Sequence, residues 1–173
     1  DCEYPFRQDS NFWYLTGFDE PDAIALFLSH KPKGERFIMF VAPKDVISEV
    51  WNGFRWGLEG AEKEFNADKA HSINELRDLL PAYINGSDEI VFTIGKHLLI
   101  EKLVLEIFSQ QLDNRSRLGI GANSIKSPEI YLNEMRLIKS EFEIKRMREA
   151  IQISAEAHEL VRESISSKKN ERQ

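Results

Sequence analysis

The sequence predicts an α/β fold, in which a mixed β-sheet is flanked by helices and the chain ends in a long connector helix. Short apolar and aromatic runs alternate along the chain with segments of helical spacing, which is typical of this class. The 173 residues suffice for one domain with a sizeable core. A long, capped helical pattern follows Ser140 and indicates the connector helix.

Three strands are predicted near the N-terminus. The aromatic-rich segment Asn11–Thr16 is interpreted as a central core strand, with successive aromatic side chains on opposite faces. Apolar runs at Ala23–Leu28 and Arg36–Val41 follow, and the first of them is expected to be buried on both faces. The loops between these segments are too short for a crossover, so antiparallel pairing is expected.

The middle of the chain is predicted to alternate between helices and one further strand. Short helices are expected at Asp45–Trp51 and around Ala61–Phe65. A capping box, Ser72-x-x-Glu75, opens the helix "INELRDLL", because these two side chains satisfy backbone N–H groups of the first turn. The run Glu89–Ile94 indicates a buried strand, and "KHLLIEKLVLEIFSQQL" after it has helical spacing. The loop "RLGIGANSIKS" is expected to contain a short edge strand.

Two helices are predicted in the C-terminal part. Ser127-Pro128 is typical of a helix start, and a second capping box, Ser140-x-x-Glu143, opens a helix that ends near Ser166. An apolar stripe along this last helix is expected to be buried. The stripe consists of Ile144, Met147, Ile151, Ser154, His158, Val161 and Ile165. We therefore expect an N-terminal domain at residues 1–139, and a connector helix with a polar tail at residues 140–173.

Charge and composition argue against several classes of partner. The net charge of −6 disfavours nucleic acid and anionic membrane surfaces, since both attract basic faces. No apolar run approaches the ~20 residues of a membrane helix, and no signal peptide is recognisable. Cys2 is the only cysteine, which excludes an internal disulfide and a thiolate metal cluster. A reducing, cytoplasmic location is therefore expected.

No catalytic constellation is recognisable from the residue patterns. The four histidines lack the His-x-His and His-x-x-x-His spacings of shared metal ligands. The acidic group Asp19-Glu20-Asp22 is interpreted as turn chemistry, and Glu141 and Glu143 as charges that complement a helix N-terminus. Phosphate-binding and nucleophile-elbow motifs are absent. The residues alone thus predict an α/β domain without an active site of its own.

Three segments nevertheless resemble one enzyme family. "EYPFRQDSNFWYLTGFDEPDA" resembles the N-terminal domain of the Xaa-Pro aminopeptidases (aminopeptidase P), which carry Asn-Ser-Asp where this chain has Asp9-Ser10-Asn11. "EVWNGFRWGLEGA" resembles the family's Trp-x-Gly-x-Arg-x-Gly segment, with Trp56 in place of an aliphatic residue. "EMRLIKSEFEIKRMREA" resembles the junction where the family's pita-bread catalytic domain begins. The three segments follow one another in the family's order.

The resemblance implies a creatinase/aminopeptidase P N-terminal-domain-like fold, without its first helix and strand and without the catalytic domain. In the family, two metal ions, usually manganese, are held by two Asp, one His and two Glu of the catalytic domain. Those ligand motifs do not occur here, so the chain alone is expected to hold no metal or other cofactor and to be inactive. The parent enzyme would release the N-terminal residue that precedes a proline. The implied partners are its own catalytic domain, further copies of the chain, and a peptide with proline at the second position.

The resemblance also implies that this domain assists oligomer assembly and lends walls to a substrate pocket, often in a neighbouring subunit. Asp1, Trp51 and Arg117 match the substrate-binding positions. An indole offers a flat apolar wall, and a guanidinium can hold a peptide carbonyl or carboxylate. The alternatives are a core tryptophan for Trp51, a surface ion pair for Arg117 and a solvated acid for Asp1.

Two other functions remain open from the sequence. A prolidase, which cleaves only dipeptides, belongs to the same superfamily, and the Trp-x-Gly-x-Arg segment favours the aminopeptidase over it. A stand-alone binding or scaffolding module is the alternative from another class. In such a module, the stripe from Ile144 to Ile165 would serve self-association.

Overall fold

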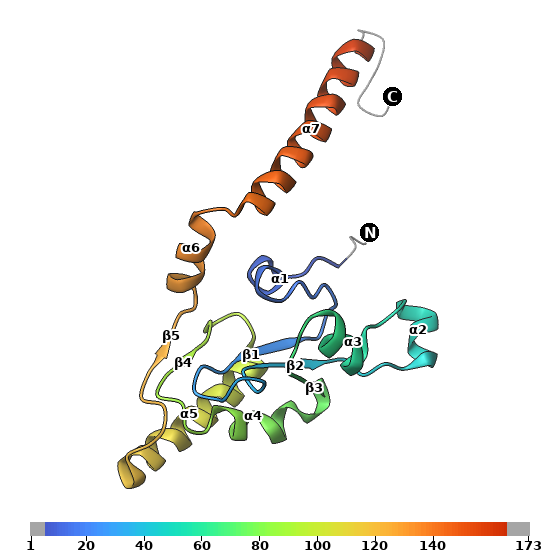
Figure 1. Cartoon of the computed structure of the whole chain (residues 1–173). Coiled ribbons are helices and arrows are strands. Elements are labelled where there is room, and N and C mark those ends of the chain that lie inside the picture. Colours follow the sequence, from blue (N-terminus) through green and yellow to red (C-terminus); the bar gives the residue numbers. More distant parts are fainter. Residues whose placement is uncertain (1–5, 166–173) are drawn as a thin grey trace. The chain divides into compact units, whose positions relative to one another are not determined.

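The computed structural model describes residues 6–165. The chain forms two compact units, Asp1–Pro128 and Glu129–Gln173. The first unit holds two small sheets and the helices that pack on them (Figure 1). Its elements are α1 (Ser10–Thr16), β1 (Ile24–Phe27), β2 (Phe37–Val41), α2 (Val46–Asn52), α3 (Gly57–Glu64), β3 (Lys69–Ser72), the 3-10 turn η1 (Ile73–Glu75), α4 (Leu76–Ile84), β4 (Ile90–Val91), α5 (Leu98–Leu118) and β5 (Ile125–Lys126).

The larger sheet has three strands in the order β1-β2-β3. β1 and β2 are antiparallel, with Ile24 opposite Phe40, whereas β2 and β3 are parallel, with Ile38 opposite Lys69. β4 and β5 form a separate, parallel two-stranded sheet. The predicted mixed sheet with flanking helices is therefore confirmed, as is the antiparallel pairing of the two apolar runs. β3 was not predicted, because "KAHS" carries little apolar signal of its own.

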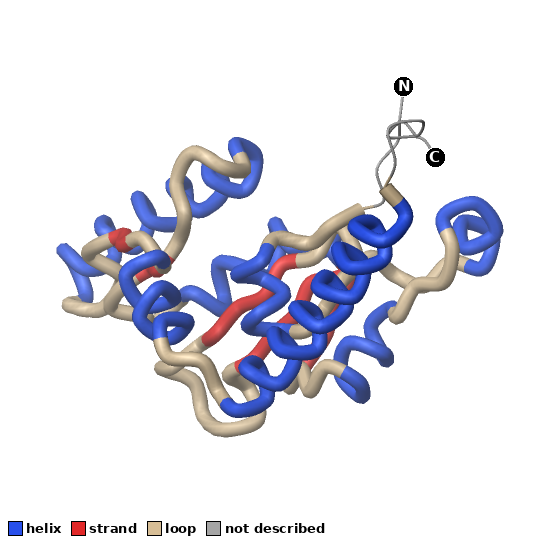
Figure 2. The backbone as a smooth tube through the Cα atoms, turned by 90° about the horizontal axis from the view of Figure 1, so that it is seen from above, coloured by secondary structure: helices blue, strands red, loops and turns tan. Residues whose placement is uncertain are grey.

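β2 is the central strand, and its side chains alternate between two cores. Ile38 and Phe40 pack in one cluster with buried residues of α4 and α5. Met39 and Val41 pack in the other with Phe18 and with residues of α3. Figure 1 shows α4 and α5 on one side of the strands and α1 and α3 on the other, and Figure 2 shows the strands in the middle of this unit. Burial on both faces explains the continuous apolar run of β2.

The predicted core strand Asn11–Thr16 is wrong, since this segment forms the helix α1. The carboxylate of Asp9 caps its start by accepting hydrogen bonds from the backbone N–H groups two and three positions on, at 2.9 and 3.1 Å. Gly17 ends it in the left-handed region, with φ of 70°. Local capping at both ends therefore outweighs the strand preference of the aromatic residues. Phe12 packs on the second core cluster, whereas Trp13 is 57% exposed.

Replacing Asp9 with alanine should lower the free energy of unfolding by about 1 kcal/mol at neutral pH. The hydrogen bond from the Phe12 N–H is the main reason that the pKa of Asp9 lies below its usual 3.8. A carboxyl with a lowered folded-state pKa stabilises the fold above its unfolded value, and this contribution is lost as the pH falls through the folded value. Urea denaturation should therefore show a smaller effect of Asp9→Ala in strong acid. A loss that does not change with pH would contradict the capping role, and Asp9→Asn, which keeps the cap oxygen, is the control.

Most other elements of the first unit follow the sequence expectations. The short helices around Asp45–Trp51 and Ala61–Phe65 correspond to α2 and α3, and the first capping box is complete. The strand expected at Glu89–Ile94 is only two residues long, as β4. β1 is not buried on both faces, because it is an edge strand of the sheet and Phe27 is 53% exposed.

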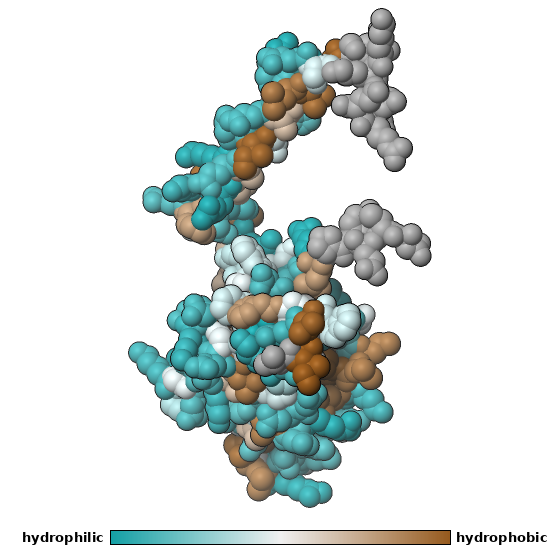
Figure 3. Space-filling model, turned by 90° about the vertical axis from the view of Figure 1, so that its right-hand side faces the viewer, coloured by the Kyte–Doolittle hydropathy of each residue, from teal (hydrophilic) through white to brown (hydrophobic). Residues whose placement is uncertain are grey.

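The second unit contains α6 (Glu129–Leu137) and α7 (Glu141–Ser164). The capping box of α7 is complete, because Ser140 Oγ accepts from the Glu143 N–H and Glu143 Oε2 accepts from the Ser140 N–H. The expected burial of the stripe on α7 is not found: the described residues of this helix include no buried side chain. Figure 3 shows brown, hydrophobic side chains exposed along α7. The predicted domain boundary before Ser140 stays a prediction.

Candidate functional site

Trp51 lies on the surface and is not a core tryptophan. It stands near the end of α2, and its side chain is 86% exposed. Ile47, Val50 and Phe54 beside it are also exposed, so that the tryptophan belongs to an apolar surface. Figure 3 faces the side on which α2 lies in Figure 1 and shows hydrophobic atoms gathered there. An exposed indole among apolar neighbours can serve as a wall for an apolar ligand.

Polar contacts hold α2 to the segments of the chain on either side of it. Glu49 Oε1 accepts a hydrogen bond from the Arg55 N–H at 3.0 Å and lies 3.8 Å from Lys44 Nζ. The same ammonium group lies 4.7 Å from the ring centroid of Phe54. These contacts connect α2 to the segments immediately before and after it.

Glu20 makes a second contact to the loop after α2. Its Oε1 accepts a hydrogen bond from the Trp56 N–H at 2.8 Å, while its Oε2 is buried without a hydrogen-bond partner. Burial raises the pKa of this carboxyl, and the Trp56 N–H and the positive charge of Arg55 oppose that shift. Interpreting Glu20 as ordinary turn chemistry was therefore wrong, because its side chain points inward and is only 7% exposed.

The ring of Trp56 continues this connection into the second core cluster. It packs edge-on against Phe54 at 5.0 Å and against Phe65 at 5.4 Å, and Phe65 packs in turn against Phe18 at 4.9 Å. The two N-terminal segments that carry the family resemblance, around Glu20 and around Trp56, thus meet in space. The larger indole in place of an aliphatic residue is accommodated by this aromatic cluster.

Arg117, another of the predicted site residues, does not lie beside Trp51 in this chain. Arg117 is exposed in the last turn of α5, and Figure 1 places that end of α5 and the helix α2 on opposite sides of the first unit. Asp1 lies outside the described residues. The substrate-binding roles of all three stay predictions, and Trp51 is the one that lies among exposed apolar side chains of α2 and the loop after it.

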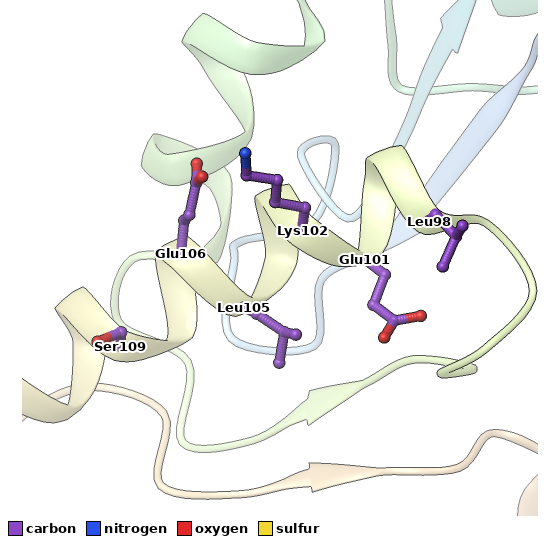
Figure 4. A pocket seen from close by; sticks show the side chains of 6 residues that line it. All are labelled: Leu98, Glu101, Lys102, Leu105, Glu106 and Ser109. Atoms are coloured by element: carbon purple, nitrogen blue, oxygen red, sulfur yellow. The ribbon is translucent and has the colours of Figure 1, made fainter.

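A shallow hollow lies on the outer face of α5. It has a volume of about 460 Å³, and all of its lining residues come from this one helix (Figure 4). They are Leu98, Glu101, Lys102, Leu105, Glu106 and Ser109. Glu106 Oε2 forms an ion pair with Arg77 Nη2 at 3.4 Å. We assign no chemistry to this open hollow on a single helix.

No metal centre is formed by the described part of the chain, where no three His, Cys, Asp or Glu side chains gather closely enough to hold an ion. Two of the four histidines, His30 and His71, have structural partners instead. His71 Nε2 lies 2.6 Å from Tyr83 Oη, and burial lowers the pKa of His71 and raises that of Tyr83. His30 Nε2 lies 3.1 Å from the Tyr83 carbonyl oxygen. Among residues 6–165, moreover, no helix combines the length and apolar composition needed to cross a bilayer.

Comparison with known proteins identifies relatives over most of the chain. A family model described as the aminopeptidase P N-terminal domain matches residues 1–92. The chain is 42% identical over 161 residues to a Xaa-Pro aminopeptidase of Haemophilus influenzae. This match covers 91% of this chain and 34% of that protein. It is 32% identical over 159 residues to a Xaa-Pro aminopeptidase of Escherichia coli, with 91% and 36% covered. The chain thus spans about a third of the length of these relatives.

Solved structures give the same likeness in three dimensions. The structure of Pseudomonas aeruginosa aminopeptidase PepP matches with a TM-score of 0.80 and 33% identity, over 91% of this chain and 36% of that one. Zinc-substituted E. coli aminopeptidase P in complex with product matches with a TM-score of 0.80 and 31% identity, with the same coverage. These matches confirm the predicted fold class.

Proposed function

The chain belongs to the family of aminopeptidase P N-terminal domains, and we propose that it serves a manganese-dependent Xaa-Pro aminopeptidase as its non-catalytic part. The whole enzyme would release the N-terminal residue that precedes a proline. A separate C-terminal domain would bind the metal ions and carry out hydrolysis, and this chain would contribute assembly surface and walls of the substrate pocket. The names of the relatives support this activity over that of a prolidase.

The observation that carries the proposal is the exposed indole of Trp51 on an apolar surface. A buried tryptophan would be explained by core packing, whereas a large apolar side chain left in water needs another partner. A proline ring or a neighbouring apolar residue of a peptide is a suitable partner, because both stack on flat aromatic faces. In the proposal, Arg117 and Asp1 supply the polar contacts to the peptide, with subunits of a homo-oligomer bringing such groups together.

The described residues do not fit a metal ion, and we assign no metal-dependent step to them. In the proposal, two manganese ions are bound by the catalytic domain. What this chain supplies is orientation: an apolar wall at Trp51 and cationic binding of a peptide carbonyl or carboxylate at Arg117. We also propose a cytoplasmic location, since a single cysteine suits a reducing compartment.

Replacing Trp51 with alanine in the full-length gene product should lower kcat/KM about tenfold for a tripeptide with proline at the second position. This corresponds to a loss of about 1.4 kcal/mol of transition-state stabilisation. The loss should appear mainly in KM, because the indole binds the substrate without taking part in the chemistry. Trp13→Ala is the matched control, since Trp13 is also exposed but lies on α1.

Each outcome of this assay separates the candidate functions. Equal kcat/KM values for Trp51→Ala and the unmodified protein would rule out Trp51 as a wall of the substrate pocket. Cleavage of dipeptides alone would indicate a prolidase. A full-length product that cleaves neither peptide, with manganese present, would favour the binding or scaffolding module.

A further inference from the structure

Glu20 is an unusual group to keep inside this domain. Among the described residues, it is the only acid or base that is buried. Burying a carboxylate is unfavourable unless hydrogen bonds replace its water, and here only Oε1 is bonded while Oε2 has no partner. The domain therefore retains a side chain whose burial is incompletely compensated. Such a group needs an explanation beyond stability.

The partner of Glu20 points to that explanation. The backbone N–H groups of Arg55 and Trp56 are neighbours in the loop between α2 and α3, and each donates to a different carboxylate. Glu49 binds the first from within α2, and Glu20 binds the second from the turn between α1 and β1. Glu20 is itself held by Gln8, whose Nε2 donates to the Glu20 carbonyl oxygen at 2.8 Å. The loop is thus fixed both to α2 and to the N-terminal part of the unit.

The described apolar side chains of α2 give it little anchorage of their own. Ile47, Val50 and Trp51 are exposed and cannot anchor the helix by packing. The helix ends at Asn52, only three positions before Arg55, so that a displacement of the loop moves the end of α2 that carries Trp51. The charges near Glu20 are those of Arg55, Asp19 and Glu49, and Lys44 pairs with Glu49.

We propose that Glu20 is a positioning residue for Trp51. By binding the Trp56 N–H, its carboxylate holds the loop that follows α2 and so directs the indole of Trp51. The inference rests on the proposed role of Trp51 as a wall of the substrate pocket, and it adds the group that sets where that wall stands. A carboxylate suits this task, because hydrogen bonds to a charged acceptor are stronger than those to a neutral one.

Residual dipolar couplings of the indole N–H groups in this chain test the inference directly. The three tryptophans, at positions 13, 51 and 56, give three indole signals. The couplings of the β2 and α4 amides define the alignment of the rigid part of the unit. In Glu20→Ala, the couplings of the Trp51 indole and of the α2 amides should no longer agree with that alignment. The coupling of the Trp13 indole should be unchanged. Glu20→Gln retains an oxygen for the Trp56 N–H and should restore the Trp51 coupling.

Glu62→Ala is the matched control. Glu62 Oε1 accepts from the Ala70 N–H at 2.9 Å, which is the same kind of bond in a part of the unit away from α2. It should lower stability without changing the Trp51 coupling. An unchanged Trp51 coupling in Glu20→Ala would overturn the inference, and so would an equal change in Glu62→Ala.

If Glu20→Ala does not fold, Glu20→Asp replaces it, since the shorter side chain withdraws the oxygen from the Trp56 N–H while keeping the charge. An unchanged Trp51 coupling in Glu20→Asp would likewise overturn the inference. The result is separate from the wall role, because Trp51→Ala tests that role by peptide cleavage. A changed Trp51 coupling in Glu20→Ala together with a normal kcat/KM in Trp51→Ala would support the positioning role of Glu20. The same pair of results would contradict the role of Trp51 as a pocket wall.

Discussion

Replacing Phe40 with alanine should lower the free energy of unfolding by about 3–5 kcal/mol, a large share of a domain's total stability. Phe40 is fully buried on the central strand β2, where it faces the cluster formed with α4 and α5. Its ring stacks on His71 at 5.3 Å and meets Tyr83 edge-on at 6.2 Å. The truncation removes these contacts and leaves a cavity between strand and helices that the surrounding backbone cannot fill.

Urea denaturation of the chain, followed by circular dichroism, measures this loss. Phe27→Ala is the control, because Phe27 lies on the edge strand β1, is half exposed and stacks on Phe37. It should cost about 1 kcal/mol. A Phe40→Ala variant that unfolds cooperatively with no greater loss than Phe27→Ala would mean that the cluster under β2 is not the main core.

Gly121→Ala should be the second most damaging change, with a loss of about 3 kcal/mol. A Cβ at this position would lie 2.6 Å from the backbone oxygen of Gln111, and φ is +131°, where side chains are strained. Arg115 Nη1 donates to the Gly121 carbonyl oxygen at 2.7 Å, so the turn is joined to the end of α5. Displacing the turn would also disturb the last turn of that helix, which carries Arg117.

Gly119→Ala separates the steric clash from the backbone effect. Gly119 also has a positive φ, of +73°, but a Cβ there would meet no atom within 4 Å. It should cost only about 1–2 kcal/mol, the usual penalty of the left-handed region. Thermal or urea unfolding of both variants compares the two losses, and equal values would show that the contact with Gln111 relaxes freely.

Local chemistry in the sequence predicted many elements of this protein. Both capping boxes, at Ser72 and Ser140, begin the segments that they were expected to begin, because their hydrogen bonds join residues three positions apart. The hairpin of β1 and β2 also follows from two apolar runs and a short loop. The family resemblance was carried by short segments and is confirmed by the comparisons.

The error at α1 was also local in origin. Asp9 and Gly17 are capping residues on either side of the aromatic run, and they could have been weighed against it. Composition suggested a strand, whereas a bonded cap at each end made a seven-residue helix. Tertiary packing then used that helix by placing Phe12 on the second core cluster and leaving Trp13 exposed.

Which residues are buried, and which distant residues meet, follows from the tertiary fold. Glu20 and Trp56 are 36 positions apart, and nothing near Glu20 in the sequence distinguishes a bonded, buried carboxylate from a solvated turn residue. β3 likewise depends on the edge of β2 that it joins, since backbone pairing needs a partner strand more than an apolar sequence. The caps, the apolar runs and the family could all be identified from local sequence. The exposure of Trp51 and the burial of the Glu20 carboxylate could not be predicted in this way. Both depend on residues that are distant in the sequence and adjacent in the fold.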